Sequence, residues 1–250
     1  MLALLHRDDH LVAIHKPAGL LVHRSALDAR ETRFAVQLLR DQLGRHVFPV
    51  HRLDKGTSGV LLFALDRETL ARLSGAFEAG AVGKRYVAVV RGHPPAEGLI
   101  DHPLSRRHDE AEHLPAGIAG TPRPARTRFR TLATAELPCR VDRYPTSRYA
   151  LAELVPETGR RHQLRRHLKH ISHPIVGDAT FGKGRHNRLF QTLFGVHRLL
   201  LACTLLTFEH PWSGSPVRIA TAPDTDFMQA VDALGWREAL QRSLSGVIDS

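Results

Sequence analysis

The sequence predicts an α+β fold in one domain that covers residues 1–250. Segments with the two-residue alternation of strands are mixed with segments that have the spacing of amphipathic helices. No internal repeat, Gly/Ser-rich linker or shift of composition marks a second domain. The hydrophobic content of 42% is that of a globular chain, and 250 residues can bury a substantial core as a single unit.

The first half of the chain predicts strands and helices in alternation. Residues 11–23, LVAIHKPAGLLVH, indicate a strand, a Lys-Pro-Ala-Gly turn and a second apolar segment. Apolar residues at helical spacing predict a helix over 31–44, which Gly44 can close. Residues 60–65 are an apolar strand, and Asp66 is in the right place to cap a helix that follows.

The second half predicts a long loop, two helices and further strands. Pro, Arg and His without periodicity indicate a surface loop over 101–128. Helical spacing predicts one amphipathic helix within 158–171 and another over 224–240. The further strands are expected within residues 85–92, 127–137, 148–156 and 198–211.

The charge of the chain favours nucleic acid as its partner. The 35 Lys and Arg outnumber the 25 Asp and Glu, so the formal net charge is +10. Arginine, whose planar guanidinium binds phosphate through two hydrogen bonds, predominates. Counterion release by such cations supplies much of the affinity for nucleic acid. A general bias towards arginine would also raise the net charge. The charge alone therefore does not distinguish a nucleic-acid partner from such a bias, and the motifs are needed.

Several other classes of protein are excluded by what the sequence lacks. No apolar run is long enough to cross a bilayer, and the apolar start is too short for a secretory signal. Cys139 and Cys203 are far apart and match no zinc or disulfide spacing, so a cytoplasmic location is expected. No metal site is expected either, because no HExxH pattern occurs. Polar or phosphate-facing roles are therefore expected for His162, His167, His170 and His173.

Residues 51–66, HRLDKGTSGVLLFALD, place one carboxylate among cations at the start of a buried strand. Asp54 is preceded by His51 and Arg52 and followed by Lys55. A turn in which Asp54 caps backbone amides would explain the pattern. A catalytic carboxylate, kept ionised by its neighbours, explains it as well. Asp54 is the single acid of this loop, which argues against the paired acids of glycosidases.

Residues 158–171, TGRRHQLRRHLKHI, are the most informative helical segment. Leu164 and Leu168 predict a buried stripe, and Arg165 falls at its edge. Arg161 and Lys169 flank Arg165 at four-residue spacing and predict a cationic ridge. The segment is typical of a surface helix with solvated charges. It also fits a helix whose arginine pairs with a buried carboxylate while the other cations bind phosphates.

Three motifs follow one another along the chain: HRLDKGTSG, KRYVAVVRG and TGRRHQLRRHLKHISHPIVGDATFG. Together with the upstream KPAGLLVH, they resemble the RluA family of RNA pseudouridine synthases. The resemblance implies the pseudouridine synthase catalytic fold: a mixed, mostly antiparallel sheet with flanking helices and a basic active-site cleft. It also implies an isomerase that needs no cofactor and no metal. The segment RYPTSRYALAEL and the lack of an N-terminal S4-like RNA-binding domain resemble the branch that acts on uridine 65 of tRNA.

The resemblance assigns roles to five residues. Asp54 matches the catalytic aspartate, and Arg165 matches the basic residue that pairs with it. Tyr86 matches the tyrosine that stacks on the target base and helps to deprotonate its C5 atom. Leu164 matches the apolar residue on the other side of the base. Arg52 matches an arginine that fills the gap left by a flipped base.

The remaining expectations concern substrate contacts and the course of the reaction. Arg161 and His162 are expected to bind the RNA, and a monomer is expected. Asp54 either attacks C1′ directly or abstracts a ribose proton to give a glycal. Ribosomal RNA is the alternative substrate within the family. A non-catalytic protein that binds or folds RNA is the alternative from another class.

The chain departs from the family pattern at three positions. Ala202 stands where related chains often carry histidine. Asp178 and Phe181 stand where the family often has an aromatic pattern. None of the three is expected to touch the reacting groups.

Overall fold

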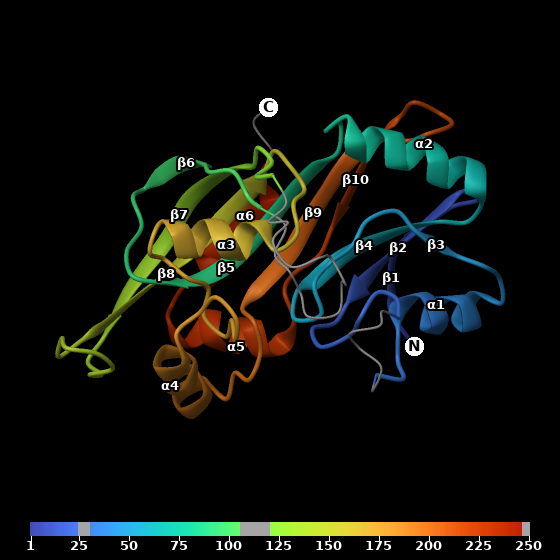
Figure 1. Ribbon diagram of the computed structural model, residues 1–250. Coiled ribbons are helices and arrows are strands. Elements are labelled where there is room, and N and C mark those ends of the chain that lie inside the picture. Colours follow the sequence, from blue (N-terminus) through green and yellow to red (C-terminus); the bar gives the residue numbers. More distant parts are fainter. Residues whose placement is uncertain (25–30, 106–120, 247–250) are drawn as a thin grey trace.

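The computed structural model describes residues 1–24, 31–105 and 121–246. Within these residues, ten strands form one sheet, in which every pairing is antiparallel except that of β4 with β9 (Figure 1). Helices flank the sheet, so the expected mixed, mostly antiparallel α+β fold is confirmed. No helix in the described ranges has the length and apolarity needed to cross a bilayer.

The strands follow the order β1-β2-β4-β9-β5-β8-β7-β6 across the sheet, with β3 paired to β4 and β10 paired to β9. Their bounds are β1 Ala3–Arg7, β2 Leu11–Lys16, β3 Phe48–Pro49, β4 Ser58–Ala64, β5 Gly83–Arg91, β6 Glu97–Asp101, β7 Arg126–Leu137, β8 Ser147–Pro156, β9 Leu201–Glu209 and β10 Pro216–Ala220.

Six helices lie on the two faces of this sheet within the described part of the chain. They are α1 Ala35–Leu43, α2 Arg67–Glu78, α3 Gln163–His170, α4 Gly184–Phe194, α5 Thr225–Ala233 and α6 Arg237–Ser245.

Two apolar clusters divide the core between the faces of the sheet. Along β5, Tyr86 and Ala88 belong to one cluster, which also contains Leu164 of α3. Val87 and Val89 belong to the other cluster, which contains residues of α4, α5 and α6. Side chains of a strand alternate between faces, so β5 separates the α3 face from the α5 face.

A short parallel pairing at the centre of the sheet brings distant motifs together. β4 meets β9 at two register pairs, Ser58 with Ala202 and Gly59 with Cys203. Gly59 has φ +107°, and a Cβ there would lie 1.9 Å from the carbonyl oxygen of Cys203, so only glycine fits. On the other side of β9, Cys203 is opposite Tyr86 of β5. The loop that precedes β4 therefore ends near Tyr86.

Local signals predicted several element boundaries. The expected helix over 31–44 is α1, followed by Gly44 in the left-handed conformation with φ 66°. Asp66 caps α2 as expected, because its side chain accepts a hydrogen bond from the Thr69 amide.

Other boundaries were predicted wrongly or not at all. The helix expected over 224–240 is two helices, α5 and α6, because Gly235 takes a left-handed conformation with φ 71° between them. The helix expected within 158–171 begins only at Gln163. Some elements of the described chain carried too weak a pattern to be predicted, namely β1, β3, β6, β10 and α4.

The loop expected over 101–128 lies mostly outside the described residues. Its last part is not a loop, because β7 begins at Arg126. Leu104 and Arg123 form an isolated β-bridge just outside the undescribed residues.

Candidate active site

Asp54 and Arg165 lie side by side although 111 residues separate them in sequence. Asp54 lies in the turn before β4, where its carbonyl accepts a hydrogen bond from the Thr57 amide. Arg165 lies on α3, and its Nη1 atom donates to Asp54 Oδ2 over 2.9 Å. The Asp54 side chain keeps 28% of its surface exposed and the Arg165 side chain 12%. A carboxylate that is held from one side and partly exposed on the other is accessible to a ligand.

Two of the cationic sequence neighbours of Asp54, Lys55 and His51, do not hold its charge, contrary to expectation. Lys55 turns away to pair with Glu31. His51 accepts a hydrogen bond from the Leu62 amide through Nε2. Burial, and secondarily a nearby lysine, lowers the pKa of His51 to about 3, so its imidazole is neutral at physiological pH. The charge that faces Asp54 comes instead from the arginine on α3.

Asp178 holds Arg165 from the side opposite Asp54. Arg165 Nε donates to Asp178 Oδ2 over 2.7 Å and Arg165 Nη2 donates to Oδ1 over 2.9 Å. The Asp178 side chain is fully buried and also accepts hydrogen bonds from the amides of Thr180 and Phe181. Burial raises the pKa of Asp178, but these hydrogen bonds outweigh it and leave the pKa below its usual value. Burial lowers the pKa of Arg165, but the two carboxylates outweigh it and raise that pKa.

Asp178 and Phe181 were expected to stay away from the proposed chemistry, but both contact Arg165, the partner of Asp54. The Phe181 ring lies 5.0 Å from Cζ of Arg165, a cation–π distance. The signal in the sequence was an aspartate in the Gly-bounded segment GDATFG, but only the structure shows that it is buried and therefore needs a partner. Ala202, the third departure, belongs to the cluster on the opposite face and stays away from this site.

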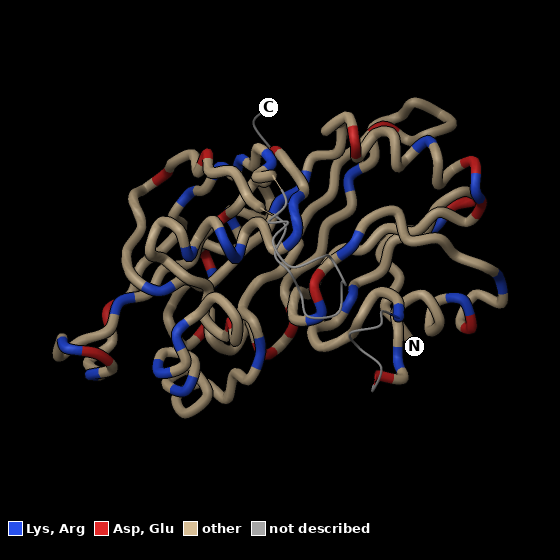
Figure 2. Tube along the Cα trace, viewed as in Figure 1, with Lys and Arg blue, Asp and Glu red and all other residues tan. Residues whose placement is uncertain are grey.

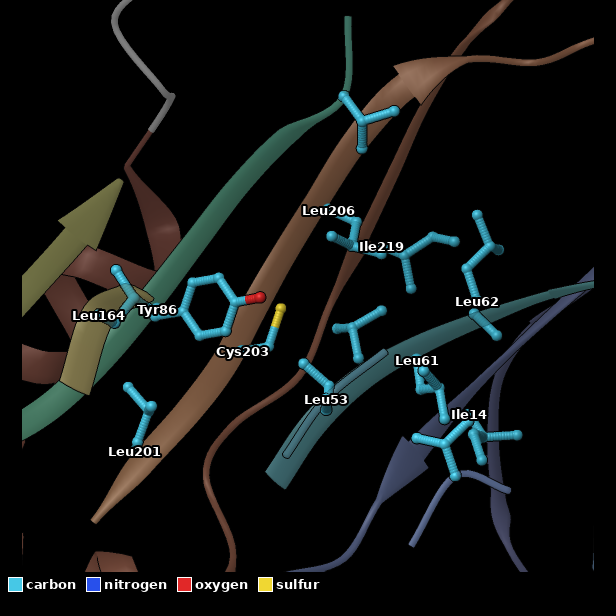
Figure 3. Close-up of a cluster of buried hydrophobic side chains, with 14 of the residues drawn as sticks. Ile14, Leu53, Leu61, Leu62, Tyr86, Leu164, Leu201, Cys203, Leu206 and Ile219 are labelled. Carbon is cyan, nitrogen blue, oxygen red and sulfur yellow. The ribbon is translucent and has the colours of Figure 1, made fainter. Parts of the chain in front are cut away.

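Tyr86 and Leu164 lie together next to the charged pair. Figure 3 shows Leu164 beside the Tyr86 ring, with the Tyr86 hydroxyl directed at the sulfur of Cys203. Burial, followed by the effects of Cys203 and then Asp54, raises the pKa of Tyr86 well above its ordinary value. Tyr86 is therefore a neutral phenol in the free protein.

Three further predicted substrate residues flank the site. Arg52 is exposed next to Asp54, and Arg161 is exposed just before α3. Arg161 therefore does not continue a helical ridge with Lys169, which was the expectation. His162 has its Nε2 atom 3.7 Å from Asp54 Oδ1. Its backbone is left-handed, with φ 54°, a strained conformation for a non-glycine residue that is typical of functional sites.

A family model matches most of this chain. The model, described as RNA pseudouridylate synthase, matches residues 10–170, well over half of the sequence. The chain belongs to the RNA pseudouridylate synthase family.

Individual relatives agree with that membership. A tRNA pseudouridine synthase C of Pectobacterium carotovorum is 46% identical over 240 residues, which are 96% of this chain. The chain spans 64% of the length of that relative. A protein of the same name from Vibrio cholerae is 45% identical over 96% of this chain and 98% of its own length.

A solved structure agrees as well. Human RNA Pseudouridylate Synthase Domain Containing 1 is 25% identical and superposes with a TM-score of 0.69, over 94% of this chain and 95% of that chain. The recognition of the family from its motifs is thereby confirmed.

In this member of the family, a buried lysine, Lys16, supports the Asp54 loop. The sequence analysis did not predict this role. Lys16 has no exposed surface, and its Nζ atom donates to the carbonyls of Pro17, Leu20 and Lys55. The Gly19 amide also donates to the Lys55 carbonyl, over 2.8 Å. Burial, then the charge of an arginine, lowers the pKa of Lys16 to about 7. The Lys-Pro-Ala-Gly turn is thus tied to the residue that follows Asp54.

The other histidines of the α3 segment contact groups of the protein itself. His167 is fully buried, and its ring is hydrogen-bonded to the Thr127 hydroxyl and the His102 carbonyl. His170 stacks on the ring of His102 at 3.7 Å, and His173 is hydrogen-bonded to the Arg91 carbonyl. In residues 1–24, 31–105 and 121–246, no group of three or more His, Cys, Asp or Glu could hold a metal ion.

Proposed function

We propose that this protein isomerises a uridine of tRNA to pseudouridine, with uridine 65 as the position to test first. The observation that carries the proposal is the partly exposed Asp54 carboxylate held by Arg165, with Tyr86 nearby. Curated relatives named tRNA pseudouridine synthase C support tRNA as the substrate. Residues 1–250 would act as one catalytic unit and as a monomer. The free thiols of Cys139 and Cys203 fit a cytoplasmic location.

The target uridine first leaves its stack. Flipping costs a few kcal/mol, on the order of the stacking and pairing energy lost. Tyr86 and Leu164 offer adjacent apolar surfaces against which the uracil can lie, and the exposed Arg52 can take the place of the base in the helix. Arg161 adds a phosphate contact at the mouth of the site, where counterion release favours binding.

Asp54 then acts on the ribose. Either its carboxylate attacks C1′ while the bond from C1′ to N1 breaks, or it removes the 2′ proton and a glycal forms. The uracil turns, and its C5 atom bonds to C1′ while the bond from Asp54 to C1′ breaks or, by the second route, while Asp54 returns the proton to C2′. The proton on C5 is lost and N1 gains one, so the atoms balance. Arg165 holds and orients Asp54 throughout, because Asp178 fixes the guanidinium from behind.

The properties of Tyr86 restrict its part in the last step. Because its pKa is raised, the Tyr86 hydroxyl keeps its proton, and a neutral phenol is a poor base. Tyr86 can therefore accept the C5 proton only if it gives up its own hydroxyl proton to another group. We therefore assign Tyr86 to holding the uracil ring while the proton leaves.

Unmodified tRNA transcripts provide the test of the proposal. The purified protein is incubated with them, and pseudouridine is mapped by carbodiimide labelling, beside an Asp54→Asn variant. Pseudouridine at one position with the wild type, and none with a variant that still binds tRNA, is the expected result. Activity that survives in Asp54→Asn would exclude the assigned role. Modification of ribosomal RNA but not tRNA would overturn the substrate, and tight binding of both without modification would indicate a non-catalytic RNA-binding protein.

A further inference from the structure

A second charged site lies at the end of the sheet, away from Asp54. A groove of about 420 Å³ is present between the turn that joins β7 to β8 and the start of α4. In Figure 2, Lys and Arg of these two segments gather at the lower left. The groove is lined by Arg91, Asp142, Arg143, Tyr144, Lys183 and Arg185.

The described part of the chain neutralises only part of the positive charge of this groove. Asp142 is the one carboxylate among the lining residues, and its Oδ2 atom is 3.1 Å from Nε2 of His186. That hydrogen bond is the main cause of the lowered pKa of Asp142. The four cations have no ion pair with any described carboxylate, although like charges close together repel each other. A groove of this kind favours an anion with several charges.

An exposed aromatic ring is part of the same groove. The Tyr144 side chain is among the most exposed large apolar groups, at 58%. The Arg143 guanidinium lies 4.7 Å from the centre of its ring and donates a hydrogen bond to its hydroxyl. Cations interleaved with an exposed aromatic face are typical of surfaces that bind RNA, since a ribose or an unpaired base can rest on the ring.

The chain itself connects this groove to the catalytic pair. The Phe181 ring lies 5.0 Å from Cζ of Arg165, and Lys183 follows Phe181 by two residues. Two residues span at most about 7 Å, so the Lys183 backbone is within roughly 20 Å of Arg165. Successive phosphates of an RNA strand are only a few ångströms apart along a helix, so a run of several nucleotides covers that distance. One RNA arm is therefore long enough to reach both places.

We propose that this groove binds the phosphate backbone of the RNA substrate, outside the flipped uridine. The inference rests on the function proposed above and adds a second contact region to it. Arg143, Lys183 and Arg185 are exposed and bind phosphates, and Arg91 closes the inner wall. The groove makes the enzyme prefer a large folded RNA over a short stem that contains only the target uridine.

The test compares two variants that lose the same charge. The groove variant carries Arg143→Ala, Lys183→Ala and Arg185→Ala. The control variant carries Arg7→Ala, Arg40→Ala and Arg67→Ala, three exposed arginines on β1, α1 and α2. All six side chains are exposed, so thermal melting is expected to stay near that of the wild type. Pseudouridine formation is measured on full tRNA and on a short stem that contains the target uridine.

The groove variant is expected to raise KM for tRNA about tenfold or more with kcat unchanged, and to leave the short stem unaffected. Each lost phosphate contact is expected to lower the salt dependence of tRNA binding by about one unit of slope. The control variant is expected to keep the affinity of the wild type within a few-fold. Equal effects of the two variants on tRNA, or an equal loss on tRNA and short stem, would overturn the proposal. If the wild type made no pseudouridine at all, the proposed function would fail, while the binding measurements would still decide the role of the groove.

Discussion

Arg165 and Asp54 face each other over 2.9 Å, but the protein holds them in different ways. Arg165 is fixed by two charge-assisted hydrogen bonds to a fully buried carboxylate, Asp178. Asp54 has a partly exposed side chain on a short turn, which Lys16 supports only through backbone carbonyls. The cation is thus part of the folded core, whereas the carboxylate is partly open to a ligand.

The difference indicates which residues serve stability and which serve chemistry. Removal of one partner of a buried ion pair leaves an uncompensated charge and destabilises a protein strongly. Removal of a partly exposed carboxylate leaves a charge that water can reach. Substitutions on the two sides should therefore separate loss of stability from loss of activity.

The largest expected effect is on activity, from Asp54→Asn. The amide can neither attack C1′ nor take up a proton, so turnover should fall by at least about 10³-fold. The melting temperature should change little, because Asp54 is partly exposed. Single-turnover kinetics and thermal melting of the same preparation check both statements. A loss of activity accompanied by an equally large loss of stability would contradict the division between the two sides.

Next is Asp178→Asn, which should reduce stability and activity together. Arg165 would keep only its bond to Asp54, so the free energy of unfolding should fall by about 3–5 kcal/mol at neutral pH. The pKa of Asp178 is lowered in the folded protein, so its stabilisation is present above the ordinary pKa near 3.8 and is lost as the pH falls through the lower folded value. Denaturant unfolding at pH 7 and pH 3 should show the difference from wild type shrinking in acid.

A matched control for that variant is Asp41→Asn. Asp41 pairs with Arg40 on the surface of α1, and both side chains are largely exposed. Surface pairs contribute little, so this substitution should leave the unfolding curve almost unchanged at both pH values.

Lys16→Met should have an intermediate effect. The methionine keeps the apolar stem but leaves the carbonyls of Pro17 and Leu20 without this donor, and the Lys55 carbonyl keeps only the Gly19 amide. A loss of about 2–3 kcal/mol of stability is expected. Turnover should fall about tenfold or more, because a small displacement of the Asp54 loop is costly for catalysis. Lys55→Met removes only an exposed pair with Glu31 and serves as the control.

The smallest expected effect is from Cys203→Ala. The thiol is buried, donates a hydrogen bond to the Leu205 carbonyl over 4.0 Å and faces the Tyr86 hydroxyl (Figure 3). Its loss should lower kcat a few-fold with KM unchanged, since Tyr86 loses a contact that orients its hydroxyl. Cys203→Ser keeps a hydrogen-bonding group and should restore most of the rate. Equal rates for both variants and wild type would show that Tyr86 needs no such partner.

The comparison between Arg165 and Asp54 also explains which features the sequence alone could predict. The end of α1 at Gly44 and the cap of α2 at Asp66 depend on groups within a few residues, so local patterns predict them. The motif around Asp54 and the strongly basic composition likewise indicate RNA chemistry from the sequence alone.

By itself, the sequence therefore determined the fold class, the family motifs and the residues that the motifs mark. Only the tertiary structure decided which of them share a site. The role of Asp178 as the anchor of Arg165, the neutral state of His51 and the burial of His167 depend on contacts between distant segments. Such contacts follow from the order of strands in the sheet, where two register pairs between β4 and β9 bring the Asp54 loop beside Tyr86. Ionisation and pairing depend on burial and distance in space, and neither is encoded in a local pattern.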